Sequence, residues 1–286
     1  MTRRDTADVS VIVPNYNNGR FLKDFIDSVV NSTMHPLELI VIDDGSTDDS
    51  RNILEAYNHI EYLKVILFTK HRGLPAALNC GLDHAIGKYI MRSDPDDILF
   101  PSRIEHQFKF MESDPETDVA GANVIYFDNV SKKEINRSNF PVGHKKIKAT
   151  YKRGEHGVLH PTVIAKATVY KSYRYQDIFP GEDYEIFARM IADGRKFANI
   201  REPVNLMRIH GQSSTGNLRF ETIRQTFEFR DAIFHTVTSK MRMKLYFYHV
   251  RNYRSFQTSN NSLSKFIHMV LATLSYPEKA IKRLWH

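Results

Sequence analysis

Short apolar segments alternate with amphipathic helical segments over the first ninety residues or so, and this alternation restricts the possible folds more than any other feature. The apolar segments are Val9–Pro14, Leu37–Ile42, Val65–Thr69 and Lys88–Met91. Their nearly continuous apolar character is typical of parallel strands that are covered on both faces. The pattern therefore predicts an α/β fold with a Rossmann-like, mostly parallel sheet flanked by helices.

The chain continues with less regular alternation. Ser46 is expected to cap a helix over Thr47–Tyr57, and Gly181 opens a helix that Gly194 ends. A further helix is predicted over Ser102–Ser113, and strands over Asp118–Phe127, Val158–Ala165 and Val204–Ile209. Because Pro161 cannot donate a ladder hydrogen bond, we expect its strand to lie at the edge of the sheet. Residues 128–157 are expected to form a variable loop with one short helix.

Polar turns follow each of the first four predicted strands. They contain Asn15 and Tyr16, then Asp43 and Asp44, then Lys70, His71 and Arg72, and finally Asp94, Asp96 and Asp97. The carboxyl ends of parallel strands share one edge, and ligands of such sheets bind there. The sequence therefore predicts a ligand site at this edge.

The last of these turns places three carboxylates within four residues. Asp94, Asp96 and Asp97 repel one another unless a cation lies among them. A solvated acidic turn with one Asp capping the next helix is the alternative interpretation.

The positive charge of the chain is concentrated in its tail. Residues 240–286 contain nine Lys or Arg and a single acid, Glu278, whereas the rest of the chain has a net charge of −1. An apolar stripe at helical spacing, Leu263 to Leu274, lies in the same region. We expect two domains, 1–217 and a basic, amphipathic helical appendage over 218–286.

The cysteine content and the hydropathy of the chain restrict the cellular compartment in which the protein is expected. The single cysteine, Cys80, excludes an internal disulfide and multi-cysteine zinc sites, which suits a reducing environment. The chain has neither an apolar run of 18 residues nor a long apolar segment after its N-terminal Met-Thr-Arg-Arg. The expected location is the cytoplasm.

Four segments together resemble the family 2 glycosyltransferases, which have the GT-A fold. They are V-S-V-I-V-P-N-Y-N, L-I-V-I-D-D-G-S-T-D, G-K-Y-I-M-R-S-D-P-D-D and G-E-D-Y, within residues 8–215. The resemblance implies an inverting hexosyl- or N-acetylhexosaminyltransferase that uses a nucleotide-diphosphate sugar, usually a UDP-sugar. The Q-x-x-R-W signature of processive synthases is absent, which indicates that one sugar is added.

The resemblance also implies roles for individual residues. Asp94 and Asp96 match the family's D-x-D motif, so we expect Asp96 or Asp97 to hold Mn²⁺ or Mg²⁺ and Asp94 to contact the donor. Asp43 or Asp44 matches the position that accepts a hydrogen bond from the nucleobase. The other expected donor residues are Pro14, Tyr16 and Arg72, with His210 near the diphosphate and the metal.

On the acceptor side, Asp183 matches the family's catalytic base, and Glu182 and His160 are expected beside it. Two departures from the family pattern stand out. His71-Arg72-Gly73 replaces an asparagine commonly seen before that glycine, and Pro95 replaces a small residue inside D-x-D.

Two other functions stay open at this point. A nucleotidyltransferase of related fold would need a Gly-rich, basic loop after the first strand, which N-Y-N-N-G-R matches poorly. A non-catalytic, glycan-binding relative would have lost carboxylates that this chain retains.

The tail has three possible partners: an anionic membrane surface through residues 240–286, its own catalytic domain, or nucleic acid. The resemblance favours the membrane, at the inner face of the cell membrane, because many relatives extend glycans on polyprenyl-diphosphate carriers. Nucleic acid is not expected as a partner.

Overall fold

The computed structural model describes residues 5–178, 180–210, 219–259 and 261–277. The chain forms two compact units, Met1–Gly211 and Gln212–His286, each of which is described by itself. The predicted boundary between residues 217 and 218 lies outside the described residues.

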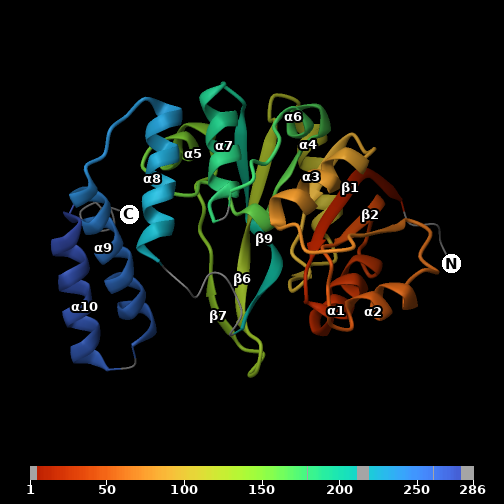
Figure 1. The fold of residues 1–286 in the computed structure, drawn as a ribbon, viewed down its shortest axis with the longest axis horizontal. Helices are drawn as coiled ribbons and strands as arrows, with labels where there is room; N and C mark the ends of the chain where they lie inside the picture. Colours follow the sequence, from red (N-terminus) through yellow and green to blue (C-terminus); the bar gives the residue numbers. More distant parts are fainter. Residues whose placement is uncertain (1–4, 179, 211–218, 260, 278–286) are drawn as a thin grey trace. The chain divides into compact units, whose positions relative to one another are not determined.

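The first unit contains one mixed sheet and the helices that flank it (Figure 1). Its strands are β1 (Thr6–Asn15), β2 (His35–Asp43), β3 (Leu63–Leu67), β4 (Tyr89–Arg92), β5 (Ile98–Leu99), β6 (Val119–Asp128), β7 (Glu134–Arg137), β8 (Ile164–Lys166) and β9 (Phe197–Ile209). Its helices are α1 (Gly19–Val30), α2 (Ser50–Ala56), α3 (Leu74–His84), α4 (Arg103–Ser113), α5 (His144–Tyr151), the 3₁₀ turn η1 (His160–Thr162), α6 (Ala167–Ser172) and α7 (Glu182–Ala192).

The strands are ordered β3-β2-β1-β4-β8-β6-β9-β5, with β7 paired to β6. The four strands β3, β2, β1 and β4 are parallel, as the apolar segments predicted. The strand β8 runs antiparallel to both of its neighbours, and β9 is parallel to β6. The predicted α/β fold with a mostly parallel sheet is confirmed.

Apolar side chains of β1 cover both faces of the sheet. Val9, Val11 and Val13 join the main core with side chains from α1, α2 and α4. On the other face α3 lies so close that a Cβ at Gly81 would be 3.1 Å from Ile12 and Ile42. Burial on both faces explains why the first strand is nearly continuously apolar.

The prediction of an edge strand at Pro161 is wrong. The residues around Pro161 form the 3₁₀ turn η1, and β8 starts only at Ile164, in the middle of the sheet between β4 and β6. Because Pro161 precedes the strand, its missing N–H costs the sheet no hydrogen bond.

Three further sequence predictions need correction. Ser46 does not cap α2, because the helix begins at Ser50 after Asp49, and the Ser46 hydroxyl accepts the Asn17 N–H instead, at 3.0 Å. Residues 128–157 contain the strand β7 as well as the helix α5. The last strand is longer than predicted, since β9 begins at Phe197.

The second unit is helical, with α8 (Phe220–Phe234), α9 (Lys240–Thr258) and α10 (Ser262–Ser275). Its small core consists of Ile223, Phe227, Met243 and Tyr246. No helix of the part of the chain that the structure describes is long and apolar enough to cross a membrane. The predicted helical stripe is present in α10, but most of its apolar side chains are exposed.

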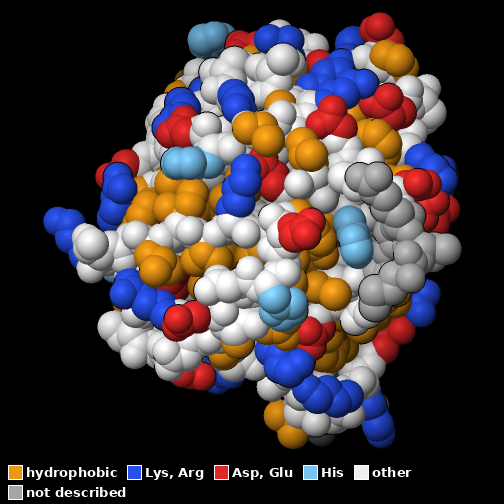
Figure 2. Space-filling model, turned by 90° about the vertical axis from the view of Figure 1, so that its right-hand side faces the viewer, with side chains coloured by type: hydrophobic (Ala, Val, Ile, Leu, Met, Phe, Trp, Pro, Cys, Tyr) orange, Lys and Arg blue, Asp and Glu red, His pale blue; other side chains and the backbone are white. Residues whose placement is uncertain are grey.

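Charged side chains of both signs are interspersed on the face drawn in Figure 2, where no large area carries one sign. This agrees with the near-neutral charge of the chain before residue 240.

Candidate active site

The predicted polar turns do meet at one edge of the sheet. Asn15, the last residue of β1, is the register partner of Asp43, the last residue of β2. The strand β4 ends beside them at Arg92. Shortly after it comes the turn with Asp94, Asp96 and Asp97, called the aspartate turn below. The edge therefore gathers residues that are far apart in the sequence.

Asp43 makes its hydrogen bonds to other groups of the protein. Its side chain is fully buried and accepts hydrogen bonds from Asn15 Nδ2 at 2.9 Å, the Ser46 N–H at 3.1 Å and Arg51 Nε at 3.3 Å. These bonds fix the turn between β2 and α2, so Asp43 has a structural role in this conformation.

Asp44 holds the neighbouring loop. Its carboxylate accepts the backbone N–H groups of Arg72 and Gly73, at 2.7 and 2.8 Å, and lies 2.9 Å from His71 Nδ1. Gly45 allows this approach, because its φ is +73° and a Cβ there would come within 2.6 Å of the Lys70 carbonyl carbon. Asp44 thus connects the ends of β2 and β3.

Tyr16 and His71 form an aromatic surface above Asp44. Their rings are stacked with centroids 3.9 Å apart, and Tyr16 is 41% exposed. Tyr16 is therefore not a core residue. Pro14, by contrast, is buried within β1 and paired with Ile42 of β2.

The three carboxylates of the aspartate turn have different partners. Asp94 Oδ1 lies 2.6 Å from Arg92 Nη2, and Asp96 Oδ2 lies 3.0 Å from His210 Nε2. Asp97 is 1% exposed; its Oδ1 accepts the Arg208 N–H and its Oδ2 has no partner within the described part of the chain. Burial, followed by the charges of Asp94 and Asp96, raises the pKa of Asp97 well above its usual range.

The residues present fit a divalent cation. A carboxylate and an imidazole suit Mn²⁺, whereas Mg²⁺ prefers oxygen ligands alone. Asp96 and His210 offer that pair, whereas Asp97 Oδ2, although without a partner among the described residues, is buried in the turn. Among the described residues no cluster of three His, Cys, Asp or Glu could hold an ion unaided. Phosphate oxygens of a ligand would have to complete the coordination.

A buried arginine, Arg103, holds the backbone that leads into the aspartate turn. Arg103 is fully buried, and all five of its N–H groups donate to protein oxygens. The acceptors are Gln107 Oε1, Ser93 Oγ, Asn205 Oδ1 and the carbonyls of Arg92 and Pro161, at 2.8 to 3.2 Å. Burial lowers the pKa of Arg103 to about 9, so the group stays charged at neutral pH.

Arg92 links the aspartate turn to the helix α7. The guanidinium is buried, and its Nε and Nη1 atoms have no hydrogen-bond partner among the residues that the structure describes. Besides its ion pair with Asp94, its charge partly offsets the burial that raises the pKa of Glu182. Arg92 therefore lies within electrostatic reach of both halves of the site.

Asp183 and Glu182 occupy the first turn of α7, after Gly181 with a φ of +114°. The Asp183 side chain is 26% exposed; its Oδ1 accepts the Tyr184 N–H at 2.7 Å and its Oδ2 lies 3.5 Å from His156 Nδ1. Glu182 is buried, and this burial, followed by the charge of Asp183, raises its pKa to about 7. Of the two carboxylates, Asp183 is the one that a ligand can reach.

We expect Glu182→Gln to be more stable than the wild type at pH 8 but not at pH 4.5. A carboxyl whose pKa is raised on folding destabilises the native state progressively as pH rises from its ordinary value of 4.5 to about 7. Glutamine carries no such charge, so its advantage in melting temperature should grow to a few degrees across this window.

Thermal unfolding from pH 4.5 to 8 measures this difference. In an Asp183→Asn background the advantage should shrink, since the neighbouring charge is one cause of the raised pKa. A difference that is the same at every pH would contradict the assignment.

His160 is buried beneath the site. Its Nε2 lies 2.7 Å from the Tyr175 hydroxyl, and its ring packs edge-on against Phe187. Burial, and next the charge of Arg92, lowers the pKa of His160 well below its usual value. A neutral His160 thus supports the site from within, and no acceptor could touch it in this conformation.

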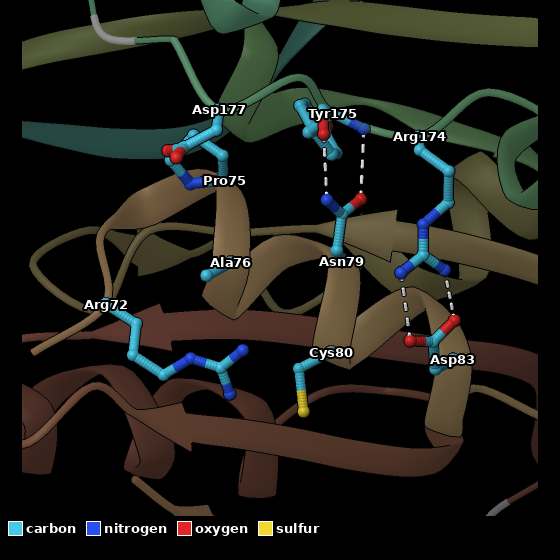
Figure 3. A pocket seen from close by; sticks show the side chains of 9 residues that line it. All are labelled: Arg72, Pro75, Ala76, Asn79, Cys80, Asp83, Arg174, Tyr175 and Asp177. Atoms are coloured by element: carbon cyan, nitrogen blue, oxygen red, sulfur yellow. Dashed lines mark hydrogen bonds and ion pairs between the residues drawn. The ribbon is translucent and has the colours of Figure 1, made fainter. Parts of the chain in front are cut away.

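A cavity of about 500 Å³ adjoins this edge of the sheet at Arg72 (Figure 3). It lies between α3 and the segment 174–177, and the Arg72 side chain extends across it. Asn79 holds the backbone of Tyr175 by two hydrogen bonds, at 2.8 and 3.0 Å, and Asp83 pairs with Arg174. Arg72 also covers the Phe68 ring, 4.5 Å from its centroid. The cavity could receive part of a ligand bound at this edge.

Sequence reasoning missed Arg92, Asn79 and the contribution of His71. Arg92 gave a usable signal, because a charged residue inside an apolar central strand must be paired. His71 was placed in a polar turn at the predicted ligand edge, but its contacts with Tyr16 and Asp44, like those of Asn79, gave no signal because these partners become neighbours only in the folded chain.

Comparison with known proteins gives a consistent result. The family described as Glycosyl transferase family 2 matches residues 10–174. An uncharacterized glycosyltransferase of Methanocaldococcus jannaschii is 32% identical over 69% of this chain and 69% of its own. The amylovoran biosynthesis glycosyltransferase AmsE of Erwinia amylovora is 30% identical over 73% of this chain and 79% of its own.

Solved structures support the same fold. S. aureus TarS in complex with UDP-GlcNAc superposes with a TM-score of 0.64 at 19% identity, covering 89% of this chain and 74% of TarS. The mannosyltransferase PcManGT of Pyrobaculum calidifontis, in complex with GDP-Man and Mn²⁺, gives a TM-score of 0.60 at 14% identity, over 99% of this chain and 80% of its own. The sheet is therefore of the GT-A type.

Proposed function

The chain belongs to glycosyltransferase family 2, and from this premise we propose that it transfers one sugar from a nucleotide-diphosphate sugar to an acceptor hydroxyl, with inversion. The donor is a UDP-sugar carrying a hexose or N-acetylhexosamine. The acceptor is a glycan or a polyprenyl-diphosphate-linked oligosaccharide of a surface polysaccharide, reached in the cytoplasm at the inner face of the cell membrane. The name of AmsE and the UDP-GlcNAc bound to TarS support these choices.

One observation carries the proposal. The Tyr16–His71 stack over Asp44 and the Asp96–His210 pair lie at the same edge of the sheet, as a nucleobase and a diphosphate would require. The aromatic pair offers a flat face for the base. Asp44 is 2% exposed and its Oδ1 already receives the Arg72 N–H, so the remaining lone pair could accept from an imide group only if the loop at residues 71–73 moved.

Charge at the diphosphate has to be neutralised as the glycosidic bond breaks. Asp96 and His210 are the residues that would hold Mn²⁺, with Asp97 next to Asp96 in the turn, and the ion would supply positive charge to the departing diphosphate. Arg92 holds Asp94 in place by their 2.6 Å contact, so that its second oxygen can accept from a donor hydroxyl.

Inversion at the anomeric carbon requires a general base on the face of the sugar ring opposite the leaving group. Asp183 Oδ2 would take the proton of the acceptor hydroxyl as its oxygen bonds to the anomeric carbon and the nucleoside diphosphate departs. Its Oδ1 is fixed by the Tyr184 N–H, which orients the carboxylate. Glu182 lies too deep to serve, since it is 6% exposed.

The two other functions have less support. The matching family consists of glycosyltransferases, not nucleotidyltransferases. A non-catalytic relative is disfavoured because all the implied carboxylates are present.

A donor panel tests the proposal. UDP-glucose, UDP-GlcNAc, UDP-galactose, UDP-GalNAc and GDP-mannose are titrated into the protein by calorimetry, each with Mn²⁺, with Mg²⁺ and with EDTA. We expect one UDP-sugar to bind in the micromolar range with Mn²⁺ and to be hydrolysed slowly. Absence of binding by every donor with both metals would refute the proposal, and a preference for GDP-mannose would correct the nucleotide.

A further inference from the structure

A histidine lies beside the carboxylate that we propose as the base. His156 Nδ1 is 3.5 Å from Asp183 Oδ2. The other carboxylate oxygen, Oδ1, already accepts the Tyr184 N–H, so the oxygen left for an acceptor hydroxyl is the one that faces His156. Both side chains reach solvent, His156 by 42% and Asp183 by 26%. The imidazole therefore borders the point at which the hydroxyl would lose its proton.

The backbone on either side of His156 is fixed. The Glu155 N–H donates to the carbonyl of Thr150 in α5, at 3.2 Å. The Gly157 carbonyl accepts Nδ2 of Asn199 in β9, at 2.8 Å. Gly157 also fits tightly against α5, because a Cβ there would come within 2.8 Å of a side chain of that helix. The loop that carries His156 is thus tied to two elements of the first unit.

The ring of His156 is placed by α7, the helix that carries Asp183. It packs edge-on against the Tyr184 ring, with centroids 5.6 Å apart, and the Tyr184 hydroxyl donates to the Tyr151 carbonyl. Among the described residues, His156 is the only basic side chain within ion-pair distance of Asp183. Their 3.5 Å separation is longer than a hydrogen bond, and such contacts often tighten when a ligand binds.

The chemistry of the two groups gives the imidazole a task. A carboxylate in the first turn of a helix is stabilised in its charged form, so it gives up a captured proton readily. An imidazole is a stronger base than a carboxylate. A proton that Asp183 has taken can therefore pass to His156, whose exposed ring can release it to water.

We propose that His156 is the second proton acceptor of the sugar transfer and acts through Asp183, an inference that rests on the proposed function. The acceptor oxygen bonds to the anomeric carbon while the bond from that carbon to the diphosphate breaks, and the electron pair leaves on the diphosphate. The hydroxyl proton goes to Asp183 Oδ2. The Oδ2–H bond then breaks, and a neutral His156 takes the proton on Nδ1. This restores the carboxylate, and the imidazolium loses its proton to solvent.

Hydrolysis of the donor that binds in the calorimetric panel tests this step, because water then replaces the acceptor and must also lose a proton. His156→Ala should lower kcat about tenfold or more and leave KM for the donor unchanged. Because the His156 ring is exposed, its removal leaves a space open to solvent, and added neutral imidazole should restore most of the rate.

His59→Ala is the matched control. His59 is also exposed and also contacts a tyrosine ring, that of Tyr57, but no carboxylate lies within ion-pair distance of it in the described part of the chain. This variant should hydrolyse the donor like the wild type, with and without imidazole. His156→Ala/Asp183→Asn should not respond to imidazole, because Asp183 is then unable to supply a proton.

The proposal is overturned if His156→Ala hydrolyses the donor at the wild-type rate. It is also overturned if imidazole does not restore the lost rate, since the ring would then only pack on Tyr184. A rate as low as that of Asp183→Asn would show that the imidazole itself is the base, which also contradicts it. Donor binding should be the same in wild type and His156→Ala. Failure of every donor to bind the wild type would refute sugar transfer and this step together, whereas retained binding with unchanged hydrolysis in His156→Ala would refute this step alone.

Discussion

Replacing Asp96 with asparagine is expected to reduce metal-dependent turnover of the donor about a thousandfold, the largest effect that we predict for any single residue of the turn. Asp94 is engaged by Arg92 and Asp97 is buried, so Asp96, 23% exposed and 3.0 Å from His210, is the carboxylate best placed for a metal ion. Asparagine keeps the shape and the bond to His210 but removes the charge that attracts the cation.

Manganese affinity, read by electron paramagnetic resonance, and donor hydrolysis together measure this effect. Both should fall in Asp96→Asn and stay near wild type in Asp49→Asn, a change to an exposed aspartate of the first unit that contacts Asn52. Unchanged manganese affinity in Asp96→Asn would transfer the role to Asp97, and unchanged turnover would remove Asp96 from the site.

Asp183→Asn should leave donor affinity intact while lowering the rate of sugar transfer about 10²- to 10⁴-fold. The amide cannot take the acceptor proton, yet it retains an oxygen for the Tyr184 N–H, so the start of α7 should keep its geometry. This separation of binding from catalysis distinguishes a base from a residue that only shapes the helix.

The dissociation constant of the donor measures binding, and the single-turnover rate with an acceptor measures sugar transfer. Glu182→Gln is the matched comparison, because it removes the adjacent carboxylate, and it should retain much more transfer activity. Full transfer by Asp183→Asn would exclude it as the base, and a parallel loss of donor affinity would show that Asp183 holds the donor instead.

The parallel half of the sheet could be predicted from the sequence because burial on both faces leaves a local mark, as in Val9–Pro14. The strand β8 could not, since it has three residues and depends on two partners that flank it. The turn at Asp94 to Asp97 and the opening of α7 were predicted from local chemistry and from the family resemblance.

What held these turns in place was not predictable. Arg103 is in an ordinary amphipathic helix, and nothing near it in sequence indicates acceptors at Pro161 and Asn205. In α10 the helical period was visible, but periodicity does not say whether an apolar stripe meets protein, lipid or water. The acceptors of Arg103 and the surroundings of α10 depend on contacts between segments that are distant in the sequence.

The bonds of Arg103 also imply an order of events during synthesis. Pro161 and Asn205 leave the ribosome 58 and 102 residues after Arg103, and Arg208 and His210 still later. At 5–20 residues per second the aspartate turn thus waits about 5–20 s for its partners. Until then a nascent chain exposes three neighbouring carboxylates and an unsatisfied guanidinium. The Tyr16, Asp44 and His71 part of the site lies before Gly73 in the chain and can form first.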